Sequence, residues 1–288
     1  MKAVSLIKTL VGIWIIVIGL GCNPEEQEPA YVTFAGFNLT VDTGEGSSSA
    51  DINNVWVFAD NTYLGTYDLP ARIPMLLSGP TSLRFEAGVR ENGLSLTPQI
   101  YPFYQSVTRE VELVPGSTVN IGRQNIGYRS EAVFGFVEGF EPNRPRVFTE
   151  VITGEGPIAP TTENIFQGDA SGVIRLSDSF SVAEILTEVD FSDLFDFGEE
   201  PRLWLEMDFL SEAQGLVGIV GPGQLGDIVR AYNPGFLAKD EWTKIYFNLS
   251  EVYFESQLTD FRVGISVLLP EEETEANVYL DNIKLVYR

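Results

Sequence analysis

The chain has 288 residues, of which 41 are acidic and 18 basic, so its formal net charge is −23, and it contains no histidine. This charge excludes nucleic-acid binding, which needs clustered lysines and arginines to neutralise phosphates. The lack of histidine excludes Ser-His-Asp triads and HExxH metal sites, and a single cysteine excludes a disulfide framework or a zinc–thiolate site. Among enzyme mechanisms, carboxylate chemistry such as glycoside hydrolysis remains.

The N-terminal segment, residues 1–21, has the pattern of an export signal. Lys2 and Lys8 precede an apolar run at 10–20. This run is shorter than the ~20 residues needed to cross a bilayer. A basic start, a short apolar stretch and a small residue at its end are typical of a cleaved secretory signal. Gly21-Cys22 resembles the cleavage site of bacterial lipoproteins, although the two residues before it differ from the usual lipobox. The resemblance implies that Cys22 is the lipid attachment residue and that acyl chains anchor the protein to a membrane.

Without residues 1–21 the chain keeps 267 residues, with 16 basic against 41 acidic side chains and a formal charge of −25. This length suits two ordinary domains. Residues 22–30, CNPEEQEPA, predict an acidic, disordered tether. The acidic run after the cysteine resembles the export signal of Bacteroidetes lipoproteins, which implies a place in the outer membrane facing the cell exterior. A plain solubilising linker is the alternative.

Residues 31–128 contain short apolar runs that predict β-strands. Each run is rich in β-branched and aromatic residues and is bounded by Gly, Pro, Asn or Asp; the runs are 31–34, 55–58, 63–67, 82–85 and 107–111. Their spacing of about ten residues predicts an antiparallel β-sandwich. The segment NVWVFADNTYLGTYDLP (54–70) resembles the hairpin of PEGA-like and carboxypeptidase-regulatory-like domains, with Asn61 where that family often has glycine. This Ig/PEGA-like resemblance implies a spacer or stalk.

Residues 129–288 predict a second all-β domain. In residues 202–210, apolar and polar or aromatic side chains alternate, so that Leu203, Leu205, Met207 and Phe209 share one face. Similar strand patterns occur in 242–249, 261–267 and 277–287. Residues 181–195 fit either one short helix or a strand followed by a loop. The predicted fold class is therefore all-β, with two antiparallel β-sandwich domains.

Four segments of the second domain occur in the order seen in β-jelly-roll domains of the carbohydrate-binding, galactose-binding-like type. They are VEGFE (137–141), PRLWLEMDF (201–209), EWTKIYFNL (241–249) and VYLDNIKLV (278–286). The resemblance implies a jelly roll with a structural Ca²⁺ ion at Glu141, which follows Phe140, and at Asp281. Calcium takes six to eight oxygen ligands. The alternative is that Asp281 and Asn282 make turn hydrogen bonds before the final strand.

The same resemblance implies a concave sheet whose aromatic side chains stack on sugar rings while polar neighbours bind the hydroxyl groups. The outward-facing residues with this make-up are Trp204, Glu206 and Asp208 on one strand, Trp242, Tyr246 and Asn248 on a second, and Arg262 on a third. These are the predicted carbohydrate-binding residues. The alternative is that the outward aromatic side chains pack against the neighbouring domain or a covering loop.

Three functions are compatible with these features. The leading hypothesis is a surface lipoprotein that binds a polysaccharide or other glycan without catalysis. The second is a structural or adhesion component of the envelope that binds protein partners. The third is a glycoside hydrolase that uses Glu206 and Asp208, whose Cα atoms lie about 6 to 7 Å apart on one strand face.

Overall fold

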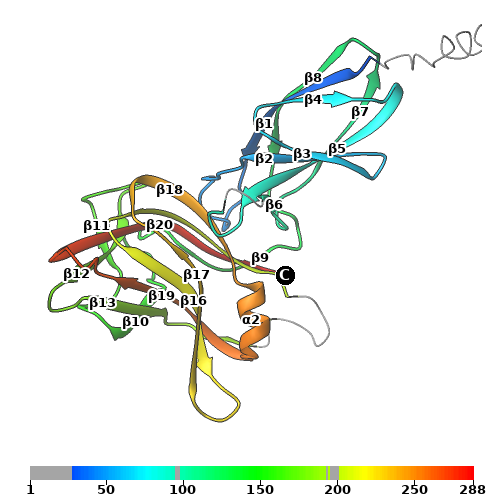
Figure 1. Ribbon diagram of the computed structural model, residues 1–288. Helices are drawn as coiled ribbons and strands as arrows, with labels where there is room; N and C mark the ends of the chain where they lie inside the picture. The colour runs from blue at the N-terminus through cyan, green and yellow to red at the C-terminus, as the bar shows by residue number, and fades with distance from the viewer. Residues whose placement is uncertain (1–27, 95–97, 193, 195–200) are drawn as a thin grey trace, which may run out of the picture.

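Within the described residues the chain is all-β apart from one short helix, as the sequence predicts. The computed structural model describes residues 28–94, 98–192, 194 and 201–288, which form two packed sandwiches (Figure 1). The predicted signal segment and Cys22 lie outside the described residues. In the part of the chain that is described, no helix is both long and apolar enough to span a membrane.

Strands β1 to β8 build the N-terminal sandwich. One sheet has the order β4-β1-β8, and the other has the order β3-β2-β5-β6 with β7 also paired to β5. Val32, Val57 and Phe85 are fully buried between the sheets. The strands are β1 (Ala30–Leu39), β2 (Asn54–Ala59), β3 (Thr62–Asp68), β4 (Ala71–Met75), β5 (Gly79–Arg90), β6 (Pro98–Ile100), β7 (Val107–Leu113) and β8 (Thr118–Ile126).

The predicted hairpin of this sandwich forms, but one strand pairing differs from the prediction. Asp60 and Asn61 connect β2 to β3 with φ of 45° and 67°, the positive values that a type I′ turn requires. Strands β1 and β8 pair in parallel, so their sheet is mixed rather than purely antiparallel. Alternation along a strand shows which face is buried and carries no information on strand direction, so the sequence could not reveal this pairing.

Strands β9 to β20 build the C-terminal sandwich from two six-stranded sheets, and every pairing between its described strands is antiparallel. The outer sheet has the order β10-β13-β19-β16-β17, with β14 paired to β19. The other sheet has the order β11-β12-β20-β15-β18, with β9 paired to β20. We call it the seam sheet, because its outward face meets the N-terminal sandwich. The strands are β9 (Val133–Glu138), β10 (Phe148–Thr153), β11 (Ala159–Thr161), β12 (Ser171–Ser177), β13 (Val182–Thr187), β14 (Phe191–Ser192), β15 (Leu203–Ser211), β16 (Gln214–Pro222), β17 (Ile228–Phe236), β18 (Lys239–Asn248), β19 (Asp260–Leu268) and β20 (Glu275–Tyr287).

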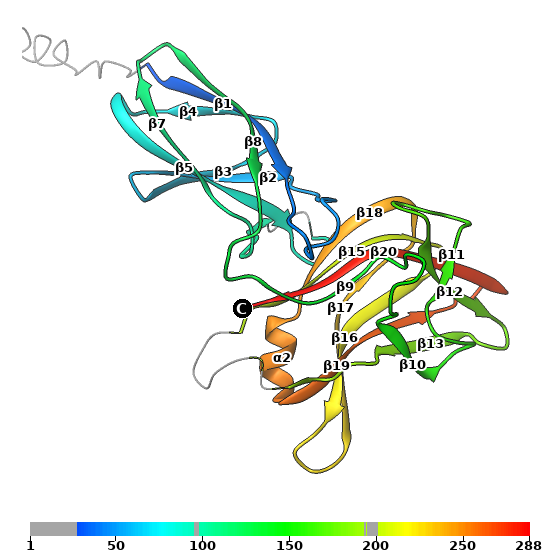
Figure 2. The same ribbon diagram turned by 180° about the vertical axis from the view of Figure 1, so that it is seen from behind.

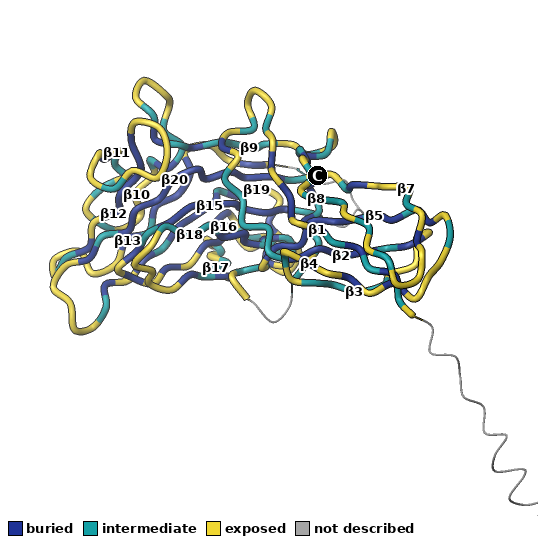
Figure 3. Tube along the Cα trace, turned by 90° about the horizontal axis from the view of Figure 1, so that it is seen from above, coloured by how far each residue is buried: buried dark blue, intermediate teal, exposed yellow. Residues whose placement is uncertain are grey.

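The core of the C-terminal sandwich consists of the apolar faces predicted from alternation. Buried residues follow the strands through the middle of the sandwich, and exposed residues concentrate in its loops (Figure 3). Leu203, Leu205, Met207 and Phe209, predicted to share one face, all belong to this core. The alternating apolar residues of the predicted strands 242–249 and 261–267 belong to it as well: Ile245, Phe247, Phe261, Val263, Ile265 and Val267. Residues 181–195 take the strand-plus-loop form, with β13 followed by β14. The short helix is instead α2 (Ser250–Ser256), after β18, where the sequence did not predict one.

The N-terminal sandwich packs with one end against the outward face of the seam sheet (Figures 1 and 2). Its buried apolar cluster continues without a break into Trp204, Tyr246 and Val286 of the seam sheet. Backbone pairing also crosses the contact, because Asn92 N–H donates to the carbonyl of Tyr246 at 2.8 Å. We call this contact between the sandwiches the seam.

Candidate functional site

Most of the predicted carbohydrate-binding residues lie in the seam and are buried. Trp204 is 4% exposed, Glu206 0%, Asp208 1% and Tyr246 1%. They do project outward from the C-terminal sandwich, as alternation predicts, but the N-terminal sandwich covers that face. The expectation of an exposed stacking platform at these residues is therefore corrected. Their aromatic rings pack against the neighbouring domain, which is the alternative that the sequence left open.

Glu206 is the centre of a buried polar network in the seam. The hydroxyls of Tyr101 and Tyr128 each donate to its Oε1 at 2.7 Å. Its Oε2 lies 3.3 Å from Nζ of Lys244 and 4.0 Å from Nζ of Lys284. Moving a charge out of water costs several kcal/mol of hydration free energy, and ion pairs and hydrogen bonds of this kind offset that cost. The network therefore joins the two sandwiches, since both tyrosines come from the N-terminal one.

The charges in this network follow from its surroundings. Burial alone raises the pKa of Glu206, but the ammonium groups of Lys284 and Lys244 and the tyrosine hydroxyls outweigh it, so the pKa of Glu206 is lowered. Burial lowers the pKa of Lys284 to about 8, although Glu206 opposes this. Burial, with the Glu206 charge, raises the pKa of Tyr101 and Tyr128 well above the usual value. At neutral pH Glu206 is thus a carboxylate that accepts hydrogen bonds from neutral phenols.

Two further predicted residues also make contacts across the seam. Asp208 accepts a hydrogen bond from Ser49 Oγ at 2.8 Å. The backbone N–H of Asn248 donates to Oδ1 of Asn92 at 2.9 Å, and its side-chain amide donates to Glu91. The residues needed to bind a sugar hydroxyl are present here, but they already bind the other domain.

Trp242 and Arg262 lie apart from the seam residues. Trp242 is partly exposed, and its ring centroid lies 5.3 Å from that of Phe166. Arg262 projects from β19 in the opposite sheet, where its guanidinium pairs with Asp190 and Glu150. The seven predicted residues therefore do not form a single site.

Glu141 and Asp281, the predicted calcium ligands, hold the loop between β11 and β12. Glu141 accepts the backbone N–H of Asp169 at 3.1 and 3.2 Å. Asp281 accepts the N–H of Gln167 at 3.1 Å and that of Asn282 at 2.7 Å. Asp281 and Asn282 lie within the final strand, β20, and not in a turn before it. Burial and the nearby charges of Asp208 and Glu141 raise the pKa of Asp281 to about 7, against the hydrogen bonds that lower it.

These two carboxylates do not by themselves fit a calcium ion. Among the described residues, no group of three or more Asp, Glu or Cys side chains is placed to hold a metal. Calcium takes six to eight oxygens, whereas the oxygens of Glu141 and Asp281 already accept backbone N–H groups. The described side chains thus form no complete set of calcium ligands, and removal of calcium is the test of the predicted ion.

The outer sheet lies on the side of the C-terminal sandwich that is turned away from the N-terminal sandwich (Figure 2). A second polar group lies on its outward face. Glu184 of β13 meets Arg230 and Tyr232 of β17 there. The Tyr232 hydroxyl and the Arg230 Nε donate to Glu184 Oε1 at 3.0 and 2.9 Å. Strands β19 and β16 lie between β13 and β17, so these side chains meet above the middle of the sheet. We call Glu184, Arg230, Tyr232 and the nearby Arg262 the outer-face site.

Glycine makes this convergence possible. Gly264 of β19 pairs with Gly218 of β16 under the site, and a Cβ at Gly264 would lie 2.4 Å from the Tyr232 hydroxyl. With no side chain there, Tyr232 extends across the sheet and stays partly exposed. Burial and the Glu184 charge raise the pKa of Tyr232, so its hydroxyl stays a protonated donor. The Arg230 side chain is 45% exposed.

A groove of about 450 Å³ lies at each end of the outer-face site. This size is within the range of about 300–1,000 Å³ for ligand pockets. One groove is lined mainly by Val182, Gln214, Leu216, Phe236, Leu237 and Leu268. The other is lined mainly by Ile152, Leu186, Val220, Ile228, Arg230 and Arg262. The face therefore combines an aromatic ring, fixed charges and two depressions.

No protein-family model matches the chain, and no curated protein matches it in sequence. Solved structures of carbohydrate-binding modules are similar in shape. One, from a study of the promiscuous specificity of β-sandwich carbohydrate-binding modules, has 15% identity and a TM-score of 0.38 and covers 91% of this chain and 99% of its own. A xylan-binding domain has 11% identity, a TM-score of 0.39 and coverage of 55% and 96%. A family 30 module of a Clostridium thermocellum cellulosomal cellulase has 12% identity, a TM-score of 0.40 and coverage of 54% and 96%. Since these scores lie below 0.5, the case for a ligand rests on this chain's own residues.

The sequence analysis missed three of the four outer-face residues. Ile228, Arg230 and Tyr232 alternate with the partly buried Val229 and Ala231 along β17, and this period of two was a usable signal for a strand. Glu184 lies in the segment that fitted either a helix or a strand, so its face was undefined. Their convergence depends on strand order, which no local pattern contains.

Proposed function

We propose that the protein binds a glycan, without catalysis, at the outer-face site. The observation that carries this proposal is the partly exposed Tyr232, extended over glycines, with Glu184 hydrogen-bonded to both its hydroxyl and Arg230, and Arg262 nearby. An aromatic ring can stack on a sugar ring. Carboxylate oxygens accept from sugar hydroxyls, and guanidinium groups donate to them.

The surrounding charges favour a neutral glycan. Arg230 is paired with Glu184, and Arg262 with Asp190 and Glu150, so neither arginine is an unneutralised cation. The whole chain carries a net charge of −23, which repels polyanions. Grooves on both sides of Tyr232 suit a ligand of several sugar units. The structures that resemble the chain include a xylan-binding domain, and the same broad ligand class is proposed here.

Glycoside hydrolysis by Glu206 and Asp208 has no support from their position. Both side chains are buried in the seam and lie 3.3 and 3.7 Å from Lys244 Nζ. A general acid needs a raised pKa, whereas the pKa of Glu206 is lowered. We assign the pair a structural role.

The N-terminal sandwich is proposed to be a rigid support between the sugar-binding sandwich and the membrane. The continuous apolar cluster and the Glu206 network of the seam support this role. Lipid attachment at Cys22 and an outward-facing position in the outer membrane complete the proposal, and both rest on the sequence. Metabolic labelling with a fatty acid, lost in Cys22→Ala, tests the anchor.

One observation favours a second candidate function, adhesion to a protein partner of the envelope. Val182, Leu216, Leu237 and Leu268 are 39%, 46%, 71% and 45% exposed around one groove of the outer sheet. Exposed apolar patches of this kind occur at protein contacts. Pull-down from outer membranes would recover a partner that Leu216→Asp releases.

Affinity electrophoresis against a panel of neutral polysaccharides tests glycan binding. We expect at least one polysaccharide to retard the protein, and Tyr232→Ala to weaken that binding by about tenfold, equivalent to about 1.4 kcal/mol. Tyr63→Ala is the matched control, because Tyr63 is 49% exposed in the N-terminal sandwich. Retardation by no member of the panel, or equal retardation of Tyr232→Ala, would refute the proposal.

A further inference from the structure

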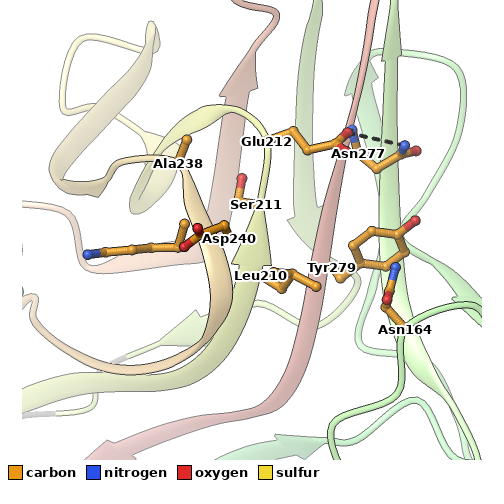
Figure 4. A pocket seen from close by; sticks show the side chains of 9 residues that line it. Asn164, Leu210, Ser211, Glu212, Ala238, Asp240, Asn277 and Tyr279 are labelled. Atoms are coloured by element: carbon orange, nitrogen blue, oxygen red, sulfur yellow. Dashed lines mark hydrogen bonds between the residues drawn. The ribbon is translucent and has the colours of Figure 1, made fainter.

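The C-terminal sandwich has a further pocket, of about 670 Å³, that the proposed function does not use (Figure 4). It lies between the turn that joins β17 to β18 and the outward side of β20. Every residue that lines it belongs to the C-terminal sandwich: Asn164, Leu210, Ser211, Glu212, Ala238, Lys239, Asp240, Asn277 and Tyr279. We call it the distal pocket.

The distal pocket occupies the part of the seam sheet that the N-terminal sandwich leaves free. Along β15, Leu210 follows Asp208, the last seam residue of that strand, by two positions and so points to the same face. Leu210 pairs with Tyr279 of β20, and Ser211 pairs with Lys239 of β18. The outward face predicted to bind sugar is thus divided into a covered half and a free half.

Tyr279 and its neighbours give the pocket an aromatic and apolar base. The Tyr279 side chain lies beside Asn164 (Figure 4), and its hydroxyl donates to Glu163 Oε2 at 3.3 Å. Burial, with the charge of Glu163, raises the pKa of Tyr279. Phe166, two residues after Asn164, is 39% exposed and contacts the ring of Trp242, two residues after Asp240. Trp242 is therefore the predicted stacking residue that lies closest to this pocket along the chain.

The polar groups of the pocket are mainly acceptors and amides. Glu212 accepts both the backbone N–H of Asn277, at 2.7 Å, and its side-chain amide, at 3.3 Å (Figure 4). This fixes the Glu212 carboxylate on one wall. Asp240 and Lys239 are exposed on the opposite wall. Carboxylates and amides are the groups that bind sugar hydroxyls in pairs.

Charge selects the class of ligand. Among the residues that line the pocket, Glu212 and Asp240 are negative and Lys239 is the one cation, while the nearby Glu163 is paired with Arg175. A net negative wall repels uronates, sulfated sugars and phosphates. We propose that the distal pocket is a second glycan site, which takes a neutral sugar residue. The inference rests on the proposed function for its ligand class, but it uses different residues on the opposite sheet.

Two sites on opposite sheets have a consequence for binding. A rigid sandwich separates them, so one short linear oligosaccharide cannot occupy both at once. The protein would then bind two short ligands independently, and it could link two polysaccharide chains.

NMR titration of isotopically labelled protein with a panel of neutral oligosaccharides tests the inference. We expect the amide signals of Asn277 and Asp240 to shift in one set and those of Tyr232 and Gly264 in another. Asn164→Ala and Asp240→Asn should each lower the affinity measured from the first set of signals at least about tenfold, and should leave the affinity measured from the second set unchanged. Tyr232→Ala should do the reverse. Glu271 lies in the acidic loop 270–274 between β19 and β20 and is exposed. Glu271→Gln is the matched charge control and should change neither set of signals.

The outcomes separate this inference from the proposed function. Shifts confined to the outer-face site, or a distal set unaffected by Asn164→Ala and Asp240→Asn, would overturn the second site and leave the proposed function intact. Shifts confined to the distal pocket would support the second site and refute the outer-face site. No shift with any member of the panel would overturn both.

Discussion

Replacement of Glu206 by glutamine tests whether the seam charges stabilise the protein. Glutamine keeps a carbonyl oxygen for the hydroxyls of Tyr101 and Tyr128, so the change removes mainly the negative charge. Lys284, whose side chain is 0% exposed, then loses its buried counter-ion, and Lys244, whose side chain is 4% exposed, keeps only Asp208, at 3.7 Å. Removing one partner of a buried ion pair costs about 3–5 kcal/mol. Lys284, with a pKa of about 8, can lose its proton at modest cost, so we expect the lower end, about 3 kcal/mol.

Urea unfolding followed by tryptophan fluorescence measures this effect, since Trp204 lies in the seam. Glu163→Gln is the control, because Glu163 pairs with Arg175 at the surface, where both side chains are about half exposed. Such an exposed pair contributes about 0–1 kcal/mol. A loss for Glu206→Gln no larger than that for Glu163→Gln would refute the idea that the charges of the seam stabilise it.

Three other predictions follow from the same structure. The pKa of Asp281 is raised from 3.8 to about 7, so its ionisation destabilises the fold as pH rises from about 4 to 7. The melting temperature of Asp281→Asn should therefore rise relative to that of the wild type across this range and stay level above it, and a constant difference would contradict this. The isolated C-terminal sandwich, residues 129–288, would expose Trp204, Tyr246 and Val286, which the N-terminal sandwich covers. It should therefore bind a hydrophobic dye and melt at a lower temperature than the whole protein. An equal melting temperature would show that the seam does not stabilise the protein. Glu141 and Asp281 already accept backbone N–H groups, so removal of calcium with EGTA should leave the melting temperature unchanged. A lower melting temperature that added calcium reverses would support the predicted calcium ion.

The sequence was sufficient to predict the fold class because alternation records burial directly. Leu205, Met207 and Phe247 alternate with polar or aromatic neighbours, and all three are core residues. The hairpin turn at Asp60-Asn61 was likewise predictable, because the backbone conformation of a two-residue turn depends on its own residues. The parallel pairing of β1 with β8 joins residues far apart in the chain, and no local pattern specifies it.

The candidate site was less predictable, because a strand pattern shows which way a side chain points and not what lies over it. Trp204 and Tyr246 were correctly placed on the outward face, yet Tyr101 and Tyr104 of the other domain cover them. Tyr232 and Glu184 meet because strand order places β19 and β16 between them, and because Gly264 leaves room. Both facts depend on tertiary structure.

A crystal structure of the protein with the neutral oligosaccharide that binds best in solution tests the central claim most directly. The claim is that the seam covers the half of the predicted sugar-binding face that holds Trp204 and Tyr246, and that the outer sheet binds glycan. We predict a sugar ring against Tyr232, with hydroxyls bound by Glu184, Arg230 or Arg262, and an unchanged seam. A sugar ring against Trp204 or Tyr246, with the two sandwiches separated, would contradict the account.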